Sequence, residues 1–165
     1  MNQERRLSRV GLFRARDRKP MSTEKLLSQV GIFRGLDQQQ LAQLARCTET
    51  RQYQAGQVIV AENETADALH IVVSGLLHLS KDHGPGREPM ISGTLGPGQY
   101  CCEMALLEDA PRAASILAAE TTTCLTLGKE RFQEELAAHP AIAVALVFEV
   151  SRRLRDTLDL LDANA

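Results

Sequence analysis

The chain has 165 residues and a formal net charge of −2, a length that suits one domain and is short for two. Hydrophobic residues make up 44% and charged residues 24%, the balance of a globular protein with a hydrophobic core. No apolar run approaches the roughly 18–20 residues that a membrane span needs, and the arginine-rich start lacks the apolar segment of a secretion signal, so we expect a cytoplasmic protein without a membrane partner.

The first twenty residues differ in charge from the rest of the chain. They hold seven basic and two acidic side chains, a net of +5, whereas the other 145 residues have a net of −7. Residues 7–17 also match residues 27–37, with seven of eleven positions identical. We therefore expect residues 1–21 to form a basic, flexible extension, with Met21 as a candidate biological start, and residues 22–165 to form the domain. The acidic charge and few aromatic residues of this domain disfavour a DNA partner.

Two short helices are predicted at the start of the domain. The first covers residues 24–30 and is interrupted at Gly31. The second begins at Asp37, whose carboxylate can accept hydrogen bonds from the first backbone N–H groups, and Gln40 completes a capping box. Its apolar face is supplied by Leu41, Leu44 and Ala45.

Residues 51–127 have the pattern of a β domain. Short apolar runs, rich in β-branched residues, alternate with turn residues such as Asn63 and Gly75. Many short strands at a spacing of roughly ten residues are typical of a sandwich or barrel. The predicted strands contain residues 58–60, 69–73, 76–79, 90–92 and 115–117.

The end of the chain is predicted to be helical again, over about residues 129–161. Gly128 can cap a helix over residues 129–138, and a longer helix follows Pro140 over residues 141–161. The seven-residue spacing within the last helix fits either a homodimer seam or burial against the β domain. The positions with this spacing are Val147, Leu154 and Leu161.

One stretch, residues 96–115, carries residues suited to binding a small anion. A Pro-Gly turn leads into a short strand, a single helical turn and then Pro111 and Arg112. An arginine in apolar surroundings is costly unless an anion meets it, and a helix N-terminus presents unpaired N–H groups to a phosphate. Glu103 is an acceptor suited to a sugar hydroxyl. The stretch therefore suits a compact sugar phosphate.

This stretch resembles the phosphate-binding cassette of the cyclic nucleotide-binding domain family. The pattern of that cassette is approximately Gly-Glu-x-Ala-Leu, a variable spacer and Pro-Arg-Ala-Ala-Thr/Ser. The resemblance extends over about residues 26–161 and implies a mainly β fold, an eight-stranded jelly-roll barrel with N-terminal helices and two C-terminal helices. The matching positions are Glu103, Ala105, Leu106, Pro111, Arg112, Ala113, Ala114 and Ser115.

The resemblance also implies roles for individual residues. Arg112 would pair bidentately with the cyclic phosphate, and Glu103 would accept from the ribose 2′-hydroxyl. Backbone N–H groups around Ala105 and Ala113 would complete the phosphate cradle, and Cys102, Met104 and Ala114 belong to the same ligand-binding set. The alternative is that Arg112 and Glu103 form a structural ion pair with each other.

Two departures from the family pattern bear on the ligand. The family usually has glycine where this chain has Cys102, so a positive φ there would be strained and the side chain would crowd the sugar. Family members that prefer cyclic GMP often carry Thr or Ser where this chain has Ala113, which favours cyclic AMP. The base would be capped by Leu154, Arg155 and Leu158 on the last helix, unless these residues serve packing or an interface.

The resemblance implies a sensor that is not an enzyme and signals through its C-terminal helices to an unidentified effector protein. The alternative is a docking domain with a degenerate pocket that binds no nucleotide. A DNA-binding domain is not expected, because four residues follow Leu161. The four cysteines are expected to be reduced apolar residues, and no metal is expected, because the histidines lack the His-x-His pair of a metal-dependent barrel enzyme. The histidines are His70, His78, His83 and His139.

Overall fold

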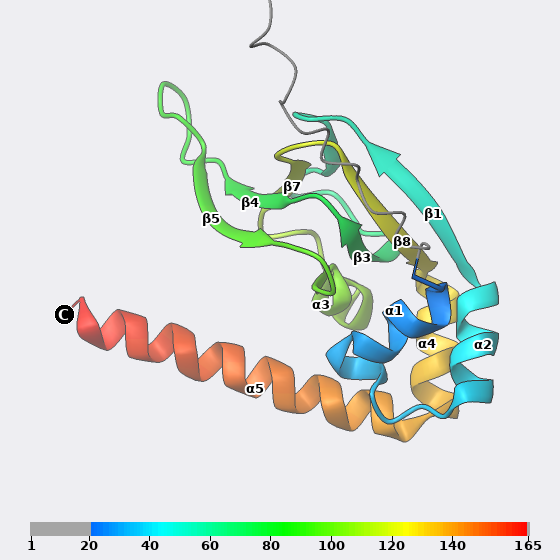
Figure 1. Cartoon of the computed structure of the whole chain (residues 1–165). Helices are drawn as coiled ribbons and strands as arrows, with labels where there is room; N and C mark the ends of the chain where they lie inside the picture. Colours follow the sequence, from blue (N-terminus) through cyan, green and yellow to red (C-terminus); the bar gives the residue numbers. More distant parts are fainter. Residues whose placement is uncertain (1–20, 165) are drawn as a thin grey trace, which may run out of the picture.

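The computed structural model describes residues 21–164 (Figure 1). The predicted basic extension therefore lies, apart from Met21, outside the described residues. The elements in chain order are α1 (Thr23–Gln29), η1 (Gly31–Phe33), α2 (Gln38–Arg46), β1 (Thr48–Tyr53), β2 (Val58–Val60), β3 (Ala68–Ser74), β4 (Leu77–Lys81), β5 (Met90–Leu95), β6 (Tyr100–Cys101), α3 (Glu103–Glu108), β7 (Ser115–Ala118), β8 (Thr122–Gly128), α4 (Lys129–Ala138) and α5 (Pro140–Ala163).

The strands form two four-stranded antiparallel sheets, which confirms the predicted eight-stranded β-roll. The strand order is β1-β8-β3-β6 in one sheet and β2-β7-β4-β5 in the other. Four of the five runs predicted as strands lie wholly within strands, and the run 76–79 begins one residue before β4. The short strand predicted before Glu103 is β6. The sequence TETRQY of β1 is mostly exposed and has no apolar run, which is why the sequence did not single it out.

The helices predicted on either side of the β domain are also confirmed. Asp37 caps α2, and its carboxylate accepts from the backbone N–H of Gln40 at 2.8 Å while the Gln40 side chain accepts from the N–H of Asp37 at 2.8 Å. Gly128 precedes α4, and Pro140 is the first residue of α5. No helix within residues 21–164 is long and apolar enough to cross a membrane.

The core lies between the two sheets and under the helices. Phe33 of η1, Phe132 of α4 and Leu69 of β3 are fully buried in it. The first half of α5 packs against η1 and α4 through Ile142 and Leu146, and the second half extends away from the β domain (Figure 1).

The exposure of three α5 residues excludes one of the two interpretations of their seven-residue spacing. Val147, Leu154 and Leu161 are all exposed, so burial of this stripe against the β domain is wrong. The homodimer seam stays a prediction.

The turn between β3 and β4 depends on a glycine. Gly75 has a φ of +94°, and a Cβ there would lie 2.6 Å from the carbonyl oxygen of Thr121 and from Cα of Thr122. The hydroxyl of Thr122 accepts from the N–H of Leu76 at 3.0 Å and donates to its carbonyl at 3.1 Å. A side chain at position 75 would therefore separate this turn from the start of β8.

Candidate functional site

The stretch predicted to bind an anion links the two sheets. Its first part, β6, pairs with β3, and its last residues lead into β7 of the other sheet. The backbone of Arg112 is held against the loop after β2, because its N–H donates to the carbonyl of Glu64 and its carbonyl accepts from the N–H of Asn63, both at 2.8 Å. The position of Arg112 is thus fixed by the backbone of a second segment.

The Arg112 side chain is half-buried and carries an unsatisfied donor. Its Nε is buried without a hydrogen-bond partner, and within residues 21–164 its guanidinium forms no ion pair. A desolvated cation with a free donor gains most from an anion with at least two oxygens. The neighbouring Ala113 is exposed and Ala114 is half-buried, so an anion can reach the cradle. The residues present fit a cyclic phosphate.

The second predicted ligand residue, Glu103, pairs with a helix that sequence reasoning did not connect to it. Glu103 begins α3 and is buried, and its Oε1 accepts from Nη1 of Arg153 on α5. The alternative ion pair between Glu103 and Arg112 is therefore wrong. Of the other cassette residues, Ala105 is buried and Met104 is exposed.

Arg153 lies in a cluster that attaches α5 to β6. Its guanidinium carbon stands 5.2 Å from the centroid of the Tyr100 ring, and its Nη2 lies 3.7 Å from Oε2 of Glu149. The Tyr100 hydroxyl donates to Glu149, and burial together with this bond raises the pKa of Tyr100. The Glu149 carboxylate rests on Gly31, where a Cβ would be 2.0 Å from its Oε1.

Tyr100, Glu149 and Arg153 were missed by sequence reasoning. The signal that was available is the spacing of Glu149 and Arg153, an opposite-charge pair four residues apart on one helix face. The residues predicted to cap the base lie elsewhere on α5. Leu154, Arg155 and Leu158 are exposed, and their role stays a prediction.

Cys102 adopts the conformation that its position in the family pattern suggested. Its φ is +80° and its side chain is fully buried. A residue with a Cβ is strained there by about 1 kcal/mol, and the side chain fills space beside Glu103. The positive φ that was expected to strain a cysteine at this position is therefore present.

Replacing Cys102 by glycine should tighten cyclic nucleotide binding by about fivefold, because removing the Cβ and sulfur lets the sugar approach the backbone, a gain of roughly 1 kcal/mol. Loss of a small buried side chain and relief of the backbone strain oppose each other, so the variant should stay folded. Calorimetric titration of Cys102→Gly beside Cys47→Ala, which lies at the end of α2, measures the effect. Equal affinities in both variants would show that the sulfur does not crowd the ligand.

Comparison with known proteins gives the same family as the cassette. Residues 50–139 match the cyclic nucleotide-binding domain family. The chain is 35% identical over 116 residues to the cyclic AMP receptor protein of Thermus thermophilus, covering 68% of this chain and 53% of that protein. Across three curated relatives, the chain spans between 28% and 53% of their lengths.

Two solved structures share the fold. The catabolite activator protein of Thermus thermophilus has a TM-score of 0.71 at 32% identity, over 80% of this chain and 63% of that chain. The regulatory domain of Toxoplasma gondii PKA, solved with cAMP, has a TM-score of 0.70 at 26% identity, over 79% of this chain and 49% of that chain. With the family matched over its β-roll and cassette, the chain belongs to the cyclic nucleotide-binding domain family.

Proposed function

We propose that this chain is a non-catalytic sensor domain for cyclic AMP, formed by residues 22–165. The observation that carries the proposal is the buried, unpartnered Nε of Arg112 at the end of the cassette. Arg112 would bind the cyclic phosphate, Glu103 would accept from the ribose 2′-hydroxyl, and backbone N–H groups around Ala105 and Ala113 would complete the cradle. No metal takes part in this binding.

The choice of cyclic AMP over cyclic GMP rests on Ala113, which has no hydroxyl to offer the base. A structural relative, the regulatory domain of Toxoplasma gondii PKA, was solved with cAMP. Calorimetric titration with both nucleotides tests the proposal, and we expect saturable binding of one cyclic AMP per chain with weaker binding of cyclic GMP. A protein that binds neither nucleotide would be the docking domain with a degenerate pocket, the alternative that the buried Cys102 side chain favours.

Occupancy of the site would be transmitted through α5. Arg153 contacts Oε1 of the same Glu103 carboxylate that the ribose hydroxyl would use, so we expect the helix contact and the nucleotide to compete for this buried carboxylate. A ligand shifts an equilibrium by its differential affinity for two states. Nucleotide binding would therefore weaken the Arg153 contact and reposition the second half of α5.

Replacing Arg153 by alanine should tighten cyclic AMP binding by about two- to fivefold, because the competing Glu103–Arg153 ion pair is lost. Since the arginine of this pair is half-exposed, the pair stabilises the nucleotide-free state by about 0.5–1 kcal/mol. The amide hydrogens of α5 should also exchange faster. Calorimetry and hydrogen exchange measure the two effects, with Arg152→Ala, an exposed neighbour on the same helix, as the matched control. If Arg153→Ala and Arg152→Ala bind cyclic AMP equally, the competition does not exist.

The output would pass to an effector protein or to a second copy through the exposed apolar residues of α5. Phe148 is 72% exposed and Val147 65% exposed, which is unusual for large apolar side chains and marks an interaction surface. Light scattering of the chain with and without cyclic AMP would identify a homodimer.

A cytoplasmic location is supported by the cysteines, because all four are free and free thiols persist in reducing compartments.

A further inference from the structure

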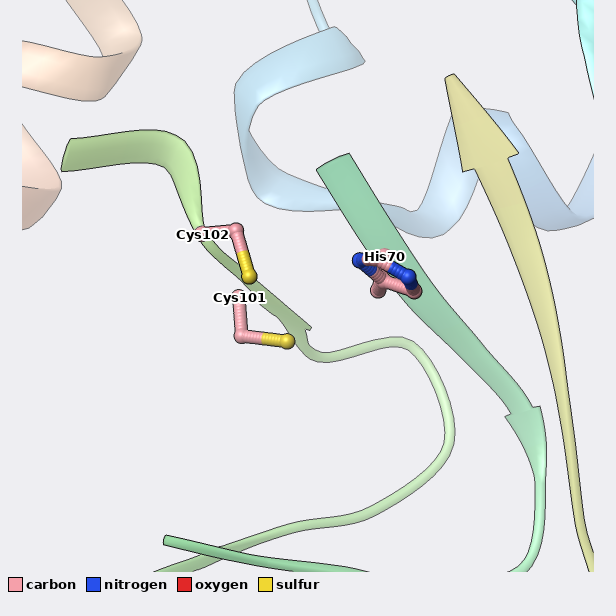
Figure 2. Close-up of side chains that lie close together, drawn as sticks. All are labelled: His70, Cys101 and Cys102. Atoms are coloured by element: carbon pink, nitrogen blue, oxygen red, sulfur yellow. The ribbon is translucent and has the colours of Figure 1, made fainter. Parts of the chain in front are cut away.

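Three side chains with metal-binding atoms meet in the interior beside the cassette. A ring nitrogen of His70 and the sulfurs of Cys101 and Cys102 all lie within 4.8 Å of one another, and each residue is at most 4% exposed. Figure 2 shows the Cys102 sulfur pointing toward Cys101, and the Cys101 sulfur pointing toward β3, which carries His70. Within residues 21–164, no fourth His, Cys, Asp or Glu joins this group at that distance.

The local backbone explains why two adjacent cysteines reach one point. Cys101 is the ladder partner of His70 in the β3–β6 pair, so their side chains share a face of the sheet. The next residue of a regular strand would point to the opposite face. Cys102 instead has a φ of +80° and leaves the strand, which directs its sulfur to the same side as that of Cys101.

A backbone hydrogen bond of His70 determines which ring nitrogen is available to a metal. Its Nδ1 donates to the carbonyl of Ala68 at 3.1 Å, because a carbonyl can only accept. In the neutral ring, Nε2 therefore keeps its lone pair. Metal-binding histidines almost always donate their other N–H to a carboxylate, a carbonyl or water in this way.

We propose that His70, Cys101 and Cys102 form a binding site for one Cu(I) ion. Two thiolates and an imidazole are a soft donor set, which selects Cu(I) or Zn(II) among biological metals. Zn(II) sites are almost always tetrahedral, with a fourth protein ligand or a water. Cu(I) is stable with three ligands. Because these three donors are buried and no fourth donor lies beside them in the described part of the chain, the site favours Cu(I) over Zn(II).

The test is an anaerobic titration of the fully reduced full chain with Cu(I), against a chromophoric Cu(I) chelator and without nucleotide. We expect one tightly bound equivalent per chain and an ultraviolet thiolate-to-copper charge-transfer band. Cys102→Gly, Cys101→Ser and His70→Gln should each weaken binding by at least tenfold, whereas Cys47→Ala should bind as the unaltered chain does. Circular dichroism reports whether each variant is folded, and Cys102→Gly removes a ligand while relieving backbone strain.

Three results would overturn the proposal. The unaltered chain could bind no Cu(I), or folded Cys102→Gly could bind it with unchanged affinity. In a parallel titration, Zn(II) could bind as tightly as Cu(I), which would exclude Cu(I) as the preferred ion. None of these results bears on cyclic nucleotide binding, which is measured separately.

Discussion

Replacing Arg112 by alanine should weaken cyclic AMP binding on the order of 100-fold or more. Two charge-assisted hydrogen bonds to the phosphate would be lost, each worth about 1.5–3 kcal/mol, and 1.4 kcal/mol corresponds to tenfold in affinity. The effect should be large because the guanidinium is half-buried and its Nε has no other partner in the described part of the chain. Calorimetric titration with cyclic AMP measures it.

Two further variants show whether the loss belongs to the guanidinium. Arg112→Lys keeps the positive charge but loses the two parallel N–H donors of the guanidinium. Its affinity for cyclic AMP should therefore lie between that of Arg112→Ala and that of the unaltered chain. Arg87→Ala removes an exposed arginine between β4 and β5 and should bind like the unaltered chain. If Arg112→Ala bound cyclic AMP normally, the proposed phosphate site would be wrong.

Replacing Gly75 by alanine should lower the free energy of unfolding by about 3 kcal/mol or more. A residue with a Cβ at φ +94° is strained by about 1–3 kcal/mol. In addition, the Cβ would lie 2.6 Å from backbone atoms of Thr121 and Thr122, which cannot rotate away as a side chain can. Such overpacking costs about 1–3 kcal/mol. Urea denaturation followed by circular dichroism measures the change.

Gly56→Ala is the matched control for the turn. Gly56 has a φ of +83° and no atom within 4 Å of a Cβ placed there, so alanine should cost only the same backbone strain, about 1–3 kcal/mol, without the clash. The difference between the two variants isolates the clash with β8. Equal losses of stability would show that the β3–β4 turn accommodates a side chain.

The sequence predicted the fold wherever a local pattern determines an element. The capping box at Asp37 and the proline at the start of α5 are short-range signals, and both are confirmed. β8 was not identified as a separate strand because its run TTCLTLG mixes threonines with apolar residues. Its position is determined by pairing with β1 and β3, which are remote in the chain.

The site was predictable only where a motif marks it. Arg112 and Glu103 stand in the cassette pattern, but the partner of Glu103 is Arg153, fifty residues away. That contact exists because α5 packs on η1 and contacts β6 through the Tyr100–Glu149 hydrogen bond, which no local spacing encodes. The cluster of His70 and the two cysteines was missed for the same reason, since strand pairing and one positive φ bring its members together.

The length of α5 has a mechanical consequence. With 24 residues at 1.5 Å each, the helix is a rod of about 36 Å that packs on η1 and α4 near its beginning and is attached in its middle by Glu149 and Arg153. A tilt of about 10° at its root would displace its far end by about 6 Å, by the geometry of a rod of that length. If nucleotide binding releases Arg153 from Glu103, as proposed, the length of α5 would amplify that local exchange into a movement larger than the contact that triggers it.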